Sequence, residues 1–399
     1  MAKQIQDAYI VAVTRTPVGK APRGMLKYVR PDDMLAHVLK AAVDRCAGLE
    51  AGAAEDVIIG CAMPEAEQGM NVARVGLLLA GFPDRVSGMT INRFCSSGVQ
   101  AVALAADRIR LGEADVMIAG GTESMSMVPM GGNKPSFNPA IFEKDENIAI
   151  AYGMGITAEK VAAQWKISRE AQDLYAADSH RRAVRAIETG EFRDEVTPYS
   201  VVERLPDLKA GEVKVTSREV VNDEGPRRDT SPEALAKLKP AFALKGTVTA
   251  GNSSQMSDGA GAVVLMSEAA VKRYNVTPLG RFVSYAVAGV PADIMGIGPV
   301  KAIPKALELA GLRQDDIDWI ELNEAFAAQT LAVIQELGLD REKVNPLGGA
   351  IALGHPLGAT GAIRTATVMH GLRRRGQKYG MVTMCIGTGM GAAGIFEAF

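Results

Sequence analysis

The chain has 399 residues, 47% of them hydrophobic, and its formal net charge is −2. This length supplies enough apolar side chains for a large buried core and predicts two or three domains. The near-neutral charge provides no general field that would attract nucleic acid, and no apolar run approaches the ~20 residues that a membrane-spanning helix needs. We therefore expect neither a nucleic-acid partner nor a membrane span.

The ends of the chain and its cysteines favour a reducing, cytoplasmic location. The first seven residues lack the apolar region of a signal peptide, and the last three, Glu397-Ala398-Phe399, are not the Ser-Lys-Leu peroxisomal address. No two cysteines have Cys-x-x-Cys spacing, which argues against a zinc ribbon, a thioredoxin motif and a disulfide framework. The four cysteines are Cys46, Cys61, Cys95 and Cys385.

Strands and helices alternate through the first 120 residues. Apolar runs predict strands at Asp7–Val13, Val57–Ile59, Met89–Phe94 and Val116–Ala119. Helical spacing of apolar residues predicts helices at Asp32–Cys46, Asn71–Leu79 and Ser97–Leu111. This alternation is typical of a parallel or mixed sheet covered by helices.

A segment of different composition follows, at residues 124–245. It is richer in charge and turn residues, and it contains a helical stretch at Thr157–Ile187 and a polar run at Glu191–Pro232. A long insertion on a scaffold is usually a lid or a ligand-binding region. We expect an inserted loop domain, after which the strand Ala262–Met266 completes the first half of the fold.

The order of elements then repeats. A stretch at Asp315–Ile320 that leads into a strand at Trp319–Leu322, a helix from Glu324, a glycine-rich turn at Gly348–Gly358, a helix at Gly361–Arg374 and a strand at Gly380–Met384 follow one another. The sequence therefore predicts a duplicated fold. Its parts are a first core half (1–123 with 246–275), the insertion (124–245) and a second core half (276–399).

Cys95 ends a predicted strand and precedes a predicted helix. Unpaired N–H groups and the dipole at a helix N-terminus stabilise a thiolate, and Gly98 allows a ligand to approach closely. Ser96 and Ser97 are expected to cap the turn. From position alone, a buried and inert cysteine is the alternative.

Three further residues lie where predicted strands meet turns. His355 sits in the glycine-rich turn, where an imidazole supplies a base near neutral pH; a histidine that merely caps a helix is the alternative. Asn323 follows a strand, and its position alone favours a helix N-cap. Cys385 follows the predicted strand Met381–Met384. The alternative interpretation of Cys385 is a packed cysteine at the end of a strand. Two cysteines and a histidine in such turns point to thiol-based nucleophilic chemistry.

Two other glycine patterns lack the context they would need. Gly389–Gly394 matches G-x-G-x-x-G, but only five residues follow it, so no dinucleotide-binding βαβ unit can form. The turn at 348–361 lacks the Gly-Lys-Ser/Thr ending of a phosphate-binding loop. The cysteines and histidines are too scattered to suggest metal-ligand spacing, so we expect no metal.

Taken together and in this order, the motifs resemble those of the thiolase family. They are Asn92-Arg93-Phe94-Cys95-Ser96-Ser97-Gly98, Gly120-Gly121-Thr122-Glu123-Ser124-Met125-Ser126, Gly246-Thr247-Val248-Thr249-Ala250-Gly251-Asn252-Ser253-Ser254, Asn323-Glu324-Ala325-Phe326, Gly354-His355-Pro356 and Cys385-Ile386-Gly387-Thr388-Gly389. The resemblance covers essentially the whole chain. It implies an α/β fold of two βαβαβαββ halves in an α-β-α-β-α layered arrangement, with an inserted loop domain.

The resemblance also implies an acyltransferase reaction, the cleavage of 3-ketoacyl-CoA by CoA to acetyl-CoA and a shortened acyl-CoA, as in fatty-acid β-oxidation. By match to the family, Cys95 carries the acyl group, His355 activates Cys95, and Cys385 is the acid/base. Asn323 positions a water that completes one oxyanion site with His355. The backbone N–H groups of Cys95 and Gly387 form a second one. Coenzyme A is a co-substrate, and no prosthetic group is implied.

The family pattern extends to the coenzyme A contacts. Ser254 and Ala250 match positions near the pantetheine, Met154 and Phe326 match the channel lining, and Arg227 matches a position near the adenine-nucleotide end. The resemblance further implies a homodimer or homotetramer. Membership of a β-oxidation complex is left open.

One position bears on the acyl chain. Acetoacetyl-CoA-forming members often carry a histidine before the Met-Gly pair of the insertion, where this chain has Gly153 before Met154. A glycine leaves room for a longer acyl tail and favours a degradative enzyme. The alternatives are a biosynthetic acetoacetyl-CoA thiolase, a thiolase-like CoA or lipid carrier without turnover, and a ketoacyl synthase. Ketoacyl synthases use two histidines, or a histidine and an asparagine, beside one cysteine, so Cys385 favours a thiolase.

Overall fold

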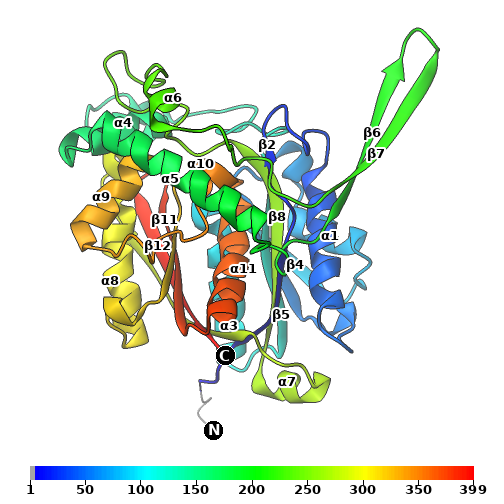
Figure 1. Cartoon of the computed structure of the whole chain (residues 1–399). Helices are drawn as coiled ribbons and strands as arrows, with labels where there is room; N and C mark the ends of the chain where they lie inside the picture. Colours follow the sequence, from blue (N-terminus) through cyan, green and yellow to red (C-terminus); the bar gives the residue numbers. More distant parts are fainter. Residues whose placement is uncertain (1–4) are drawn as a thin grey trace.

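The strands form one large sheet in the computed structural model, which describes residues 5–399 (Figure 1). The first half of the chain supplies β1 (Tyr9–Arg15), β2 (Gly19–Lys20), β3 (Asp56–Gly60), β4 (Ser87–Ile91), β5 (Val116–Ser124) and β8 (Ser257–Met266). The second half supplies β9 (Gly280–Gly289), β10 (Trp319–Leu322), β11 (Tyr379–Ile386) and β12 (Met390–Ala398).

The helices follow the same division. Those of the first half are α1 (Pro31–Asp44), α2 (Val72–Leu79) and α3 (Ser97–Arg110), and α7 (Glu268–Tyr274) leads into the second half. Those of the second half are α8 (Gly298–Ala310), α9 (Ala327–Leu337), α10 (Ala350–Leu353) and α11 (Leu357–Arg375).

The two halves have one topology. The first half has the strand order β1-β8-β5-β3-β4, and the second has β9-β12-β11-β10. β3 runs parallel to β5, as β10 runs parallel to β11, while β8 and β12 are antiparallel to their neighbours. Val344 forms a parallel bridge to Ile320 where the counterpart of β4 would lie. The predicted duplication is confirmed.

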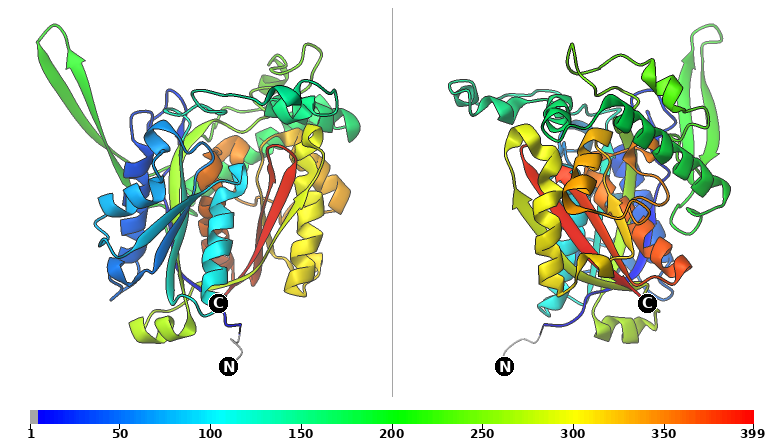
Figure 2. Two further views of the ribbon diagram at one scale, coloured as in Figure 1. Left: turned by 180° about the vertical axis from the view of Figure 1, so that it is seen from behind. Right: turned by 60° about the vertical axis from the view of Figure 1, so that its left-hand side comes forward.

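Five layers result, with α3 and α11 in the middle (Figure 2). The two central helices touch backbone to backbone, because a Cβ on Gly361 would lie 2.2 Å from the backbone nitrogen of Val99. α1 and α2 cover the outer face of the first half, and α8 and α9 cover that of the second. Only two residue pairs, Tyr9 with Arg281 and Ile10 with Gly280, join β1 to β9. The predicted α-β-α-β-α arrangement is therefore confirmed.

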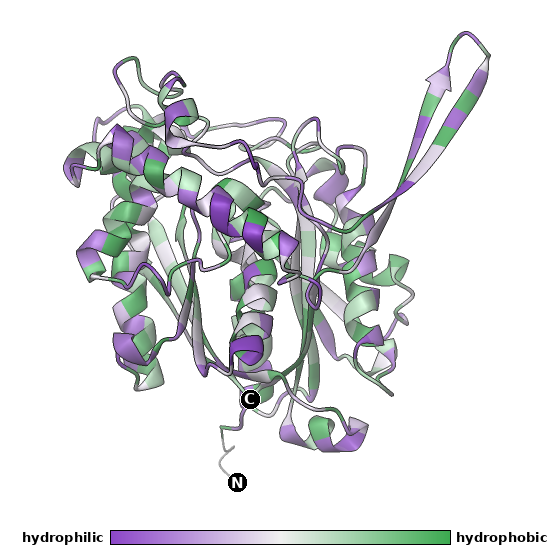
Figure 3. Cartoon of the chain, in the orientation of Figure 1, coloured by the Kyte–Doolittle hydropathy of each residue, from purple (hydrophilic) through white to green (hydrophobic). Residues whose placement is uncertain are grey.

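Small residues allow this layering. The central core around α3 and α11 is rich in alanine and valine, and a second core packs α1 and α2 on the first half of the sheet. β5 and β8 are buried along their whole lengths, as expected for strands covered on both faces. Figure 3 shows hydrophobic residues concentrated on the sheet and on the helix faces turned towards it.

The insertion lies across one end of the layers and carries α4 (Met154–Gln164), α5 (Arg169–Glu188), α6 (Pro232–Ala236) and a hairpin of β6 (Tyr199–Asp207) and β7 (Glu212–Val220). The hairpin projects from the body of the molecule (Figure 1). It lies in the segment predicted only as a polar run. The helical stretch at 157–187 is two helices, because Lys166 adopts φ 56° between them. The domain boundaries proposed from the sequence stay a prediction.

Three predicted strand ends are wrong. β5 continues through Gly120 and Gly121 to Ser124, because Gly121 still pairs with strands on both sides. β4 ends at Ile91, four residues before Cys95. β11 runs through Cys385 to Ile386, so this cysteine lies inside the strand. Among the described residues, no helix has both the length and the apolar character to cross a bilayer.

Candidate active site

Cys95 lies in a single 3₁₀ turn, Phe94–Ser96, that leads into α3. Phe94 has φ 44°, a strained conformation for a non-glycine residue, and hydrogen bonds hold it there. Its N–H donates to Asn92 Oδ1 at 2.8 Å, and its carbonyl accepts from Ser97 Oγ at 2.7 Å. Ser97 thus caps the turn as expected. The Ser96 hydroxyl instead donates to the Arg93 carbonyl at 3.1 Å.

The fold brings the two predicted catalytic cysteines to one place. Gly387 begins the turn between β11 and β12, two residues after Cys385. A Cβ on Gly387 would lie 3.8 Å from the ring of Phe94, the residue before Cys95, so this turn meets the Cys95 turn. The two sulfurs are close enough that charge on Cys95 raises the pKa of Cys385.

Both thiols are protonated at neutral pH. Burial raises the pKa of Cys95 to about 12, and the N–H groups of Gly387 and Cys95 only partly oppose it. Burial and then the neighbouring Cys95 raise the pKa of Cys385 well above its ordinary value. The expected stabilisation of a thiolate by the start of α3 is therefore outweighed by burial. Cys95 needs a base.

His355 is the predicted base, and hydrogen-bonding groups fix its position. Its backbone N–H donates to Ser257 Oγ at 3.0 Å, and its Nδ1 lies 2.6 Å from the Thr360 hydroxyl, one helical turn further along. Its Nε2 lies 3.4 Å from Nδ2 of Asn323. Burial, followed by the positive charge of Arg364, lowers the pKa of His355 to about 3. The imidazole is thus neutral and able to accept a proton.

Asn323 lies beside His355 and does not cap a helix. It directly follows β10, where its N–H donates to the Thr383 carbonyl at 2.9 Å, and α9 begins only at Ala327. The predicted alternative of a simple N-cap is therefore wrong. Its Oδ1 is buried and finds no partner among the described residues. Buried polar atoms are normally hydrogen-bonded, so this oxygen has capacity for a water or a ligand.

An apolar wall surrounds Cys385. Phe326, Ala325 and Val248 are buried against it, and Met154 packs on the same cluster. A Cβ on Gly387 would lie 3.5 Å from the Met154 sulfur, so the start of α4 reaches the turn that binds Cys95.

The remaining predicted coenzyme A contacts lie further out. Ser254 adjoins the wall, since its N–H donates to the Ala325 carbonyl at 2.9 Å. Ala250 is exposed, four residues earlier. Arg227 is exposed as well, at the edge of a groove of about 650 Å³ between α5 and residues 227–232.

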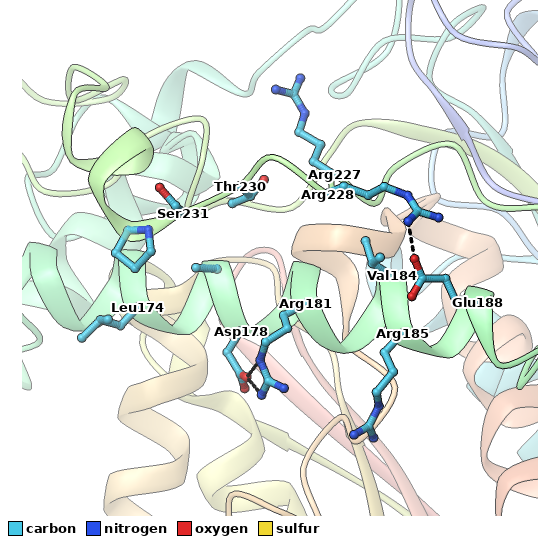
Figure 4. A pocket seen from close by; sticks show the side chains of 12 residues that line it. Leu174, Asp178, Arg181, Val184, Arg185, Glu188, Arg227, Arg228, Thr230 and Ser231 are labelled. Carbon is cyan, nitrogen blue, oxygen red and sulfur yellow. Dashed lines mark hydrogen bonds and ion pairs between the residues drawn. The ribbon is translucent and has the colours of Figure 1, made fainter.

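Arginines dominate the groove (Figure 4). Arg181 pairs with Asp178, and Arg228 pairs with Glu188, whereas the Arg227 side chain extends away from α5. The backbone N–H of Arg227 donates to His180 Nδ1 at 3.1 Å. The groove is thus separate from the cluster around Cys95, His355 and Cys385.

Sequence reasoning missed the groups that support the site. Thr360 and Ser257 hold His355, and Glu123 binds three backbone N–H groups beside Cys95. Thr360 follows His355 by five residues at the start of a predicted helix, which is a signal that could have identified it. Ser257 has no comparable signal, because it reaches His355 from a distant part of the chain.

The assembled groups suit acyl transfer with proton movement. A neutral imidazole that reaches a thiol can generate a nucleophile as it reacts, and backbone N–H groups at the thiol can stabilise an oxyanion. A second protonated thiol can supply a proton to a carbanion. Within residues 5–399, no group of three or more His, Cys, Asp or Glu side chains is arranged to hold a metal ion.

Comparisons with known proteins cover almost the whole chain. Residues 8–269 match the thiolase N-terminal domain, and residues 276–398 match the thiolase C-terminal domain. The chain is 52% identical to the 3-ketoacyl-CoA thiolase of Bacillus subtilis (strain 168), over 98% of this chain and 100% of the relative.

Two solved structures extend the comparison. The Bacillus anthracis acetyl-CoA acetyltransferase superposes with a TM-score of 0.89 at 42% identity, covering 100% of both chains. The dimeric peroxisomal thiolase of Saccharomyces cerevisiae superposes with a TM-score of 0.87 at 41% identity, covering 99% of this chain and 98% of the other.

Proposed function

The chain belongs to the thiolase family, and from this premise we propose that it cleaves 3-ketoacyl-CoA with CoA to acetyl-CoA and an acyl-CoA two carbons shorter. The reaction is an acyl transfer through an acyl-cysteine and belongs to fatty-acid β-oxidation. The observation that carries the proposal is the meeting of the two cysteine-bearing elements: β11, which carries Cys385, contacts the Phe94–Ser96 turn, and the turn at Gly387 approaches Phe94.

Cys95 acts first. His355 takes the Cys95 proton as the sulfur attacks the 3-keto carbon, and the resulting alkoxide accepts hydrogen bonds from the N–H groups of Cys95 and Gly387. Removing one such donor typically costs a factor of about 10²–10³ in rate. Because a buried thiolate is costly here, proton transfer accompanies attack and no free thiolate accumulates.

Cys385 acts on the leaving group. The bond between C2 and C3 of the substrate breaks, and its electrons form the enolate of acetyl-CoA. The enolate oxygen is held by His355 and by a water bound to Asn323, whose free Oδ1 supports this role. The Cys385 thiol then protonates the carbanion at C2, which releases acetyl-CoA and leaves a Cys385 thiolate.

The second half-reaction restores both cysteines. The Cys385 thiolate removes the proton from CoA, and the CoA sulfur attacks the acyl group on Cys95. The acyl–sulfur bond to Cys95 breaks, and the leaving sulfur takes back its proton from His355. Atoms and charges balance without a redox cofactor or prosthetic group, and coenzyme A serves only as co-substrate.

Coenzyme A binds across the insertion. Met154 and Phe326 line the channel beside the Cys385 wall, and Ser254 and Ala250 flank the pantetheine. The exposed Arg227 side chain supports a contact with the nucleotide end, whose phosphates need a cation at the surface.

The enzyme is degradative and accepts longer acyl chains. Gly153 is the exposed N-cap of α4, and a Cβ at this position would meet nothing within 4 Å, which fits an enzyme whose acyl chain is not limited by a side chain here. The identity to a 3-ketoacyl-CoA thiolase supports this assignment. The alternative is a biosynthetic acetoacetyl-CoA thiolase, favoured by the full-length likeness to an acetyl-CoA acetyltransferase.

The protein forms a homodimer or homotetramer in the cytoplasm. The dimeric yeast structure supports association. So does β4, an edge strand with a side chain, Met89, that is 41% exposed. The four free cysteines fit a reducing compartment.

Steady-state kinetics test the proposal. With 3-ketoacyl-CoA and CoA both varied, double-reciprocal plots should be parallel, and the products should be acetyl-CoA and the shortened acyl-CoA. Cys95→Ala should abolish turnover, whereas Cys46→Ala, a buried cysteine remote from the site, should retain it. Intersecting plots, or turnover by Cys95→Ala, would refute the acyl-cysteine route.

A further inference from the structure

Glu123 is a fully buried carboxylate at the end of β5, beside the Cys95 turn. Its Oε2 accepts the N–H of Ala62 at 2.7 Å and that of Gly358 at 2.8 Å. Its Oε1 accepts the N–H of Met63 at 3.2 Å and also binds the Gln68 side-chain amide. The Cys61 thiol lies 3.8 Å from Oε1.

This set of partners favours an ionised carboxylate. Three backbone N–H groups and one amide NH₂ can only donate, so each oxygen of Glu123 must accept at least two bonds. A protonated acid would place its own hydrogen against one of these donors. Hydrogen bonds of this kind to a charged acceptor are stronger than neutral ones. Burial raises the pKa of Glu123, and the N–H groups of Ala62, Gly358 and Met63 with the Gln68 amide oppose that rise, so this network favours the charged form in a fully buried site.

The donors come from both halves of the fold. Ala62 and Met63 follow β3 and pack near Cys95, whereas Gly358 is the second residue of α11, three residues after His355. The first N–H groups of a helix have no partner within the helix, and a carboxylate at that end also offsets the helix dipole. Glu123 thus anchors the start of α11 to the wall behind Cys95.

The start of α11 at Gly358 is closely packed against neighbouring backbone. A Cβ on Gly121 would lie 2.2 Å from the Gly358 carbonyl oxygen, and one on Gly98 would lie 2.9 Å from the same atom. Gly358 is therefore wedged between β5 and the start of α3. Leu357, its neighbour, belongs to the cluster on which Cys95 packs. A shift of the first turn of α11 would move His355 relative to Cys95.

We propose that Glu123 is a positioning residue, whose ionised carboxylate fixes the start of α11 and thereby sets His355 against Cys95. This inference rests on the proposed function, because it assumes that His355 activates Cys95. Among the described residues, Glu123 has no hydrogen bond to Cys95 or Cys385, and it takes no proton during the reaction.

For Glu123→Gln, an effect through charge and an effect through geometry would change the reactivity of the Cys95 thiol in opposite directions. The negative charge raises the pKa of Cys95, so if Glu123 acted through its field alone, Glu123→Gln would make the thiol more reactive. If Glu123 positions His355, Glu123→Gln makes the thiol less reactive, since the new NH₂ faces existing donors and releases α11. Glu123→Asp keeps the negative charge but shortens the side chain.

The test is the rate at which iodoacetamide alkylates Cys95 in the full-length protein, followed by peptide mass spectrometry, together with the kinetics of thiolysis. We expect both Glu123→Gln and Glu123→Asp to slow alkylation and to lower kcat at least tenfold, with a smaller change in KM, as a displacement approaching 1 Å costs about 10² in rate. Glu195→Gln is the matched control, because Glu195 is equally buried but binds Arg15 and Thr367. It should destabilise the fold and leave Cys95 alkylation within about twofold.

Wild-type or faster alkylation in a folded Glu123→Asp or Glu123→Gln variant would overturn the inference. The conservative Asp variant keeps the test decisive if the Gln variant does not fold. His355→Ala separates this inference from the proposed function. If His355→Ala slows alkylation and the Glu123 variants do not, only the role of Glu123 fails. If His355→Ala leaves alkylation unchanged, the activation of Cys95 by His355 fails as well.

Discussion

Gly98→Ala tests whether the contact between the two central helices sets the active site. Gly98 is the second residue of α3, three residues after Cys95, and it lies against the first turns of α11, which follow His355. A Cβ on Gly98 would lie 2.6 Å from the Ala362 nitrogen and 2.9 Å from the Gly358 oxygen. Backbone atoms on both sides leave no flexible side chain to move aside.

The size of the effect follows from these distances. Ordinary contact begins at 3.4 Å, so the helices must separate by about 0.8 Å to admit the methyl group. Overpacking of this kind lowers the free energy of unfolding by about 1–3 kcal/mol. The same displacement moves His355 away from Cys95, and a misplacement of about 1 Å lowers the rate on the order of 10²-fold. We expect kcat for thiolysis to fall by this factor with a smaller change in KM.

The assay is thiolysis kinetics, with urea unfolding to report the free energy. Gly289→Ala is the matched control, because it places the same methyl group where nothing lies within 4 Å. It should leave kcat within about twofold and the free energy of unfolding unchanged or slightly higher. A Gly98→Ala enzyme with wild-type stability and kcat would refute the claim that this helix contact sets the site.

Further predictions concern the groups around His355 and the acyl chain. Thr360→Val leaves the buried His355 Nδ1 without its partner, at a cost of about 1–3 kcal/mol in transition-state stabilisation. We therefore expect kcat to fall about 5–150-fold and Thr360→Ser to restore it. Unchanged kcat in Thr360→Val would contradict this role of Thr360. Because burial lowers the pKa of His355 to about 3, the unfolded chain binds the extra proton between about pH 6.5 and 3, and stability falls as pH falls through this range. His355→Asn should flatten that fall in urea unfolding, and an equal pH slope in both proteins would count against the buried neutral imidazole. Burial raises the pKa of Glu321 to about 7, so the native state holds the proton between pH 4.5 and 7, and the free energy of unfolding falls as pH rises through this range. Glu321→Gln should remove that fall, which is about 3 kcal/mol at most. An unchanged pH slope in the variant would exclude Glu321 as its source. For a degradative enzyme, kcat/KM with a C8–C16 3-ketoacyl-CoA should exceed that with acetoacetyl-CoA, and Gly153→His should reduce the ratio; a wild-type ratio well below one would favour the biosynthetic alternative.

Much of the layered core could be predicted because its elements bury one face in a regular pattern. Apolar spacing placed α1 and α3 within two residues of their ends. The end of β5 was misjudged, because Gly120 and Gly121 normally signal a turn, whereas here they admit the close approach of neighbouring backbone. The β6–β7 hairpin escaped prediction because its strands are mostly exposed and lack an apolar face buried on the core.

The reactive residues could be located from the sequence, but their protonation states and the residues that hold them in place could not. The motifs singled out Cys95, His355 and Cys385 from local context. The protonation of both thiols depends on burial by residues far apart in sequence, and Gly387 approaches the Cys95 turn only through the fold. Glu123 was visible in the sequence as part of a motif. Its role depends on Gly358, which lies 235 residues away along the chain.

The most direct test of the central claim is a rapid quench of the enzyme with 3-ketoacyl-CoA in the absence of CoA, followed by peptide mapping of all four cysteines. We expect an acyl group on Cys95 alone, formed with release of acetyl-CoA. We also expect far slower acylation in His355→Ala, and no release of acetyl-CoA when Cys385 is replaced by alanine. An acyl group on any other cysteine, or thiolysis that proceeds with no acylated enzyme, would contradict the central claim.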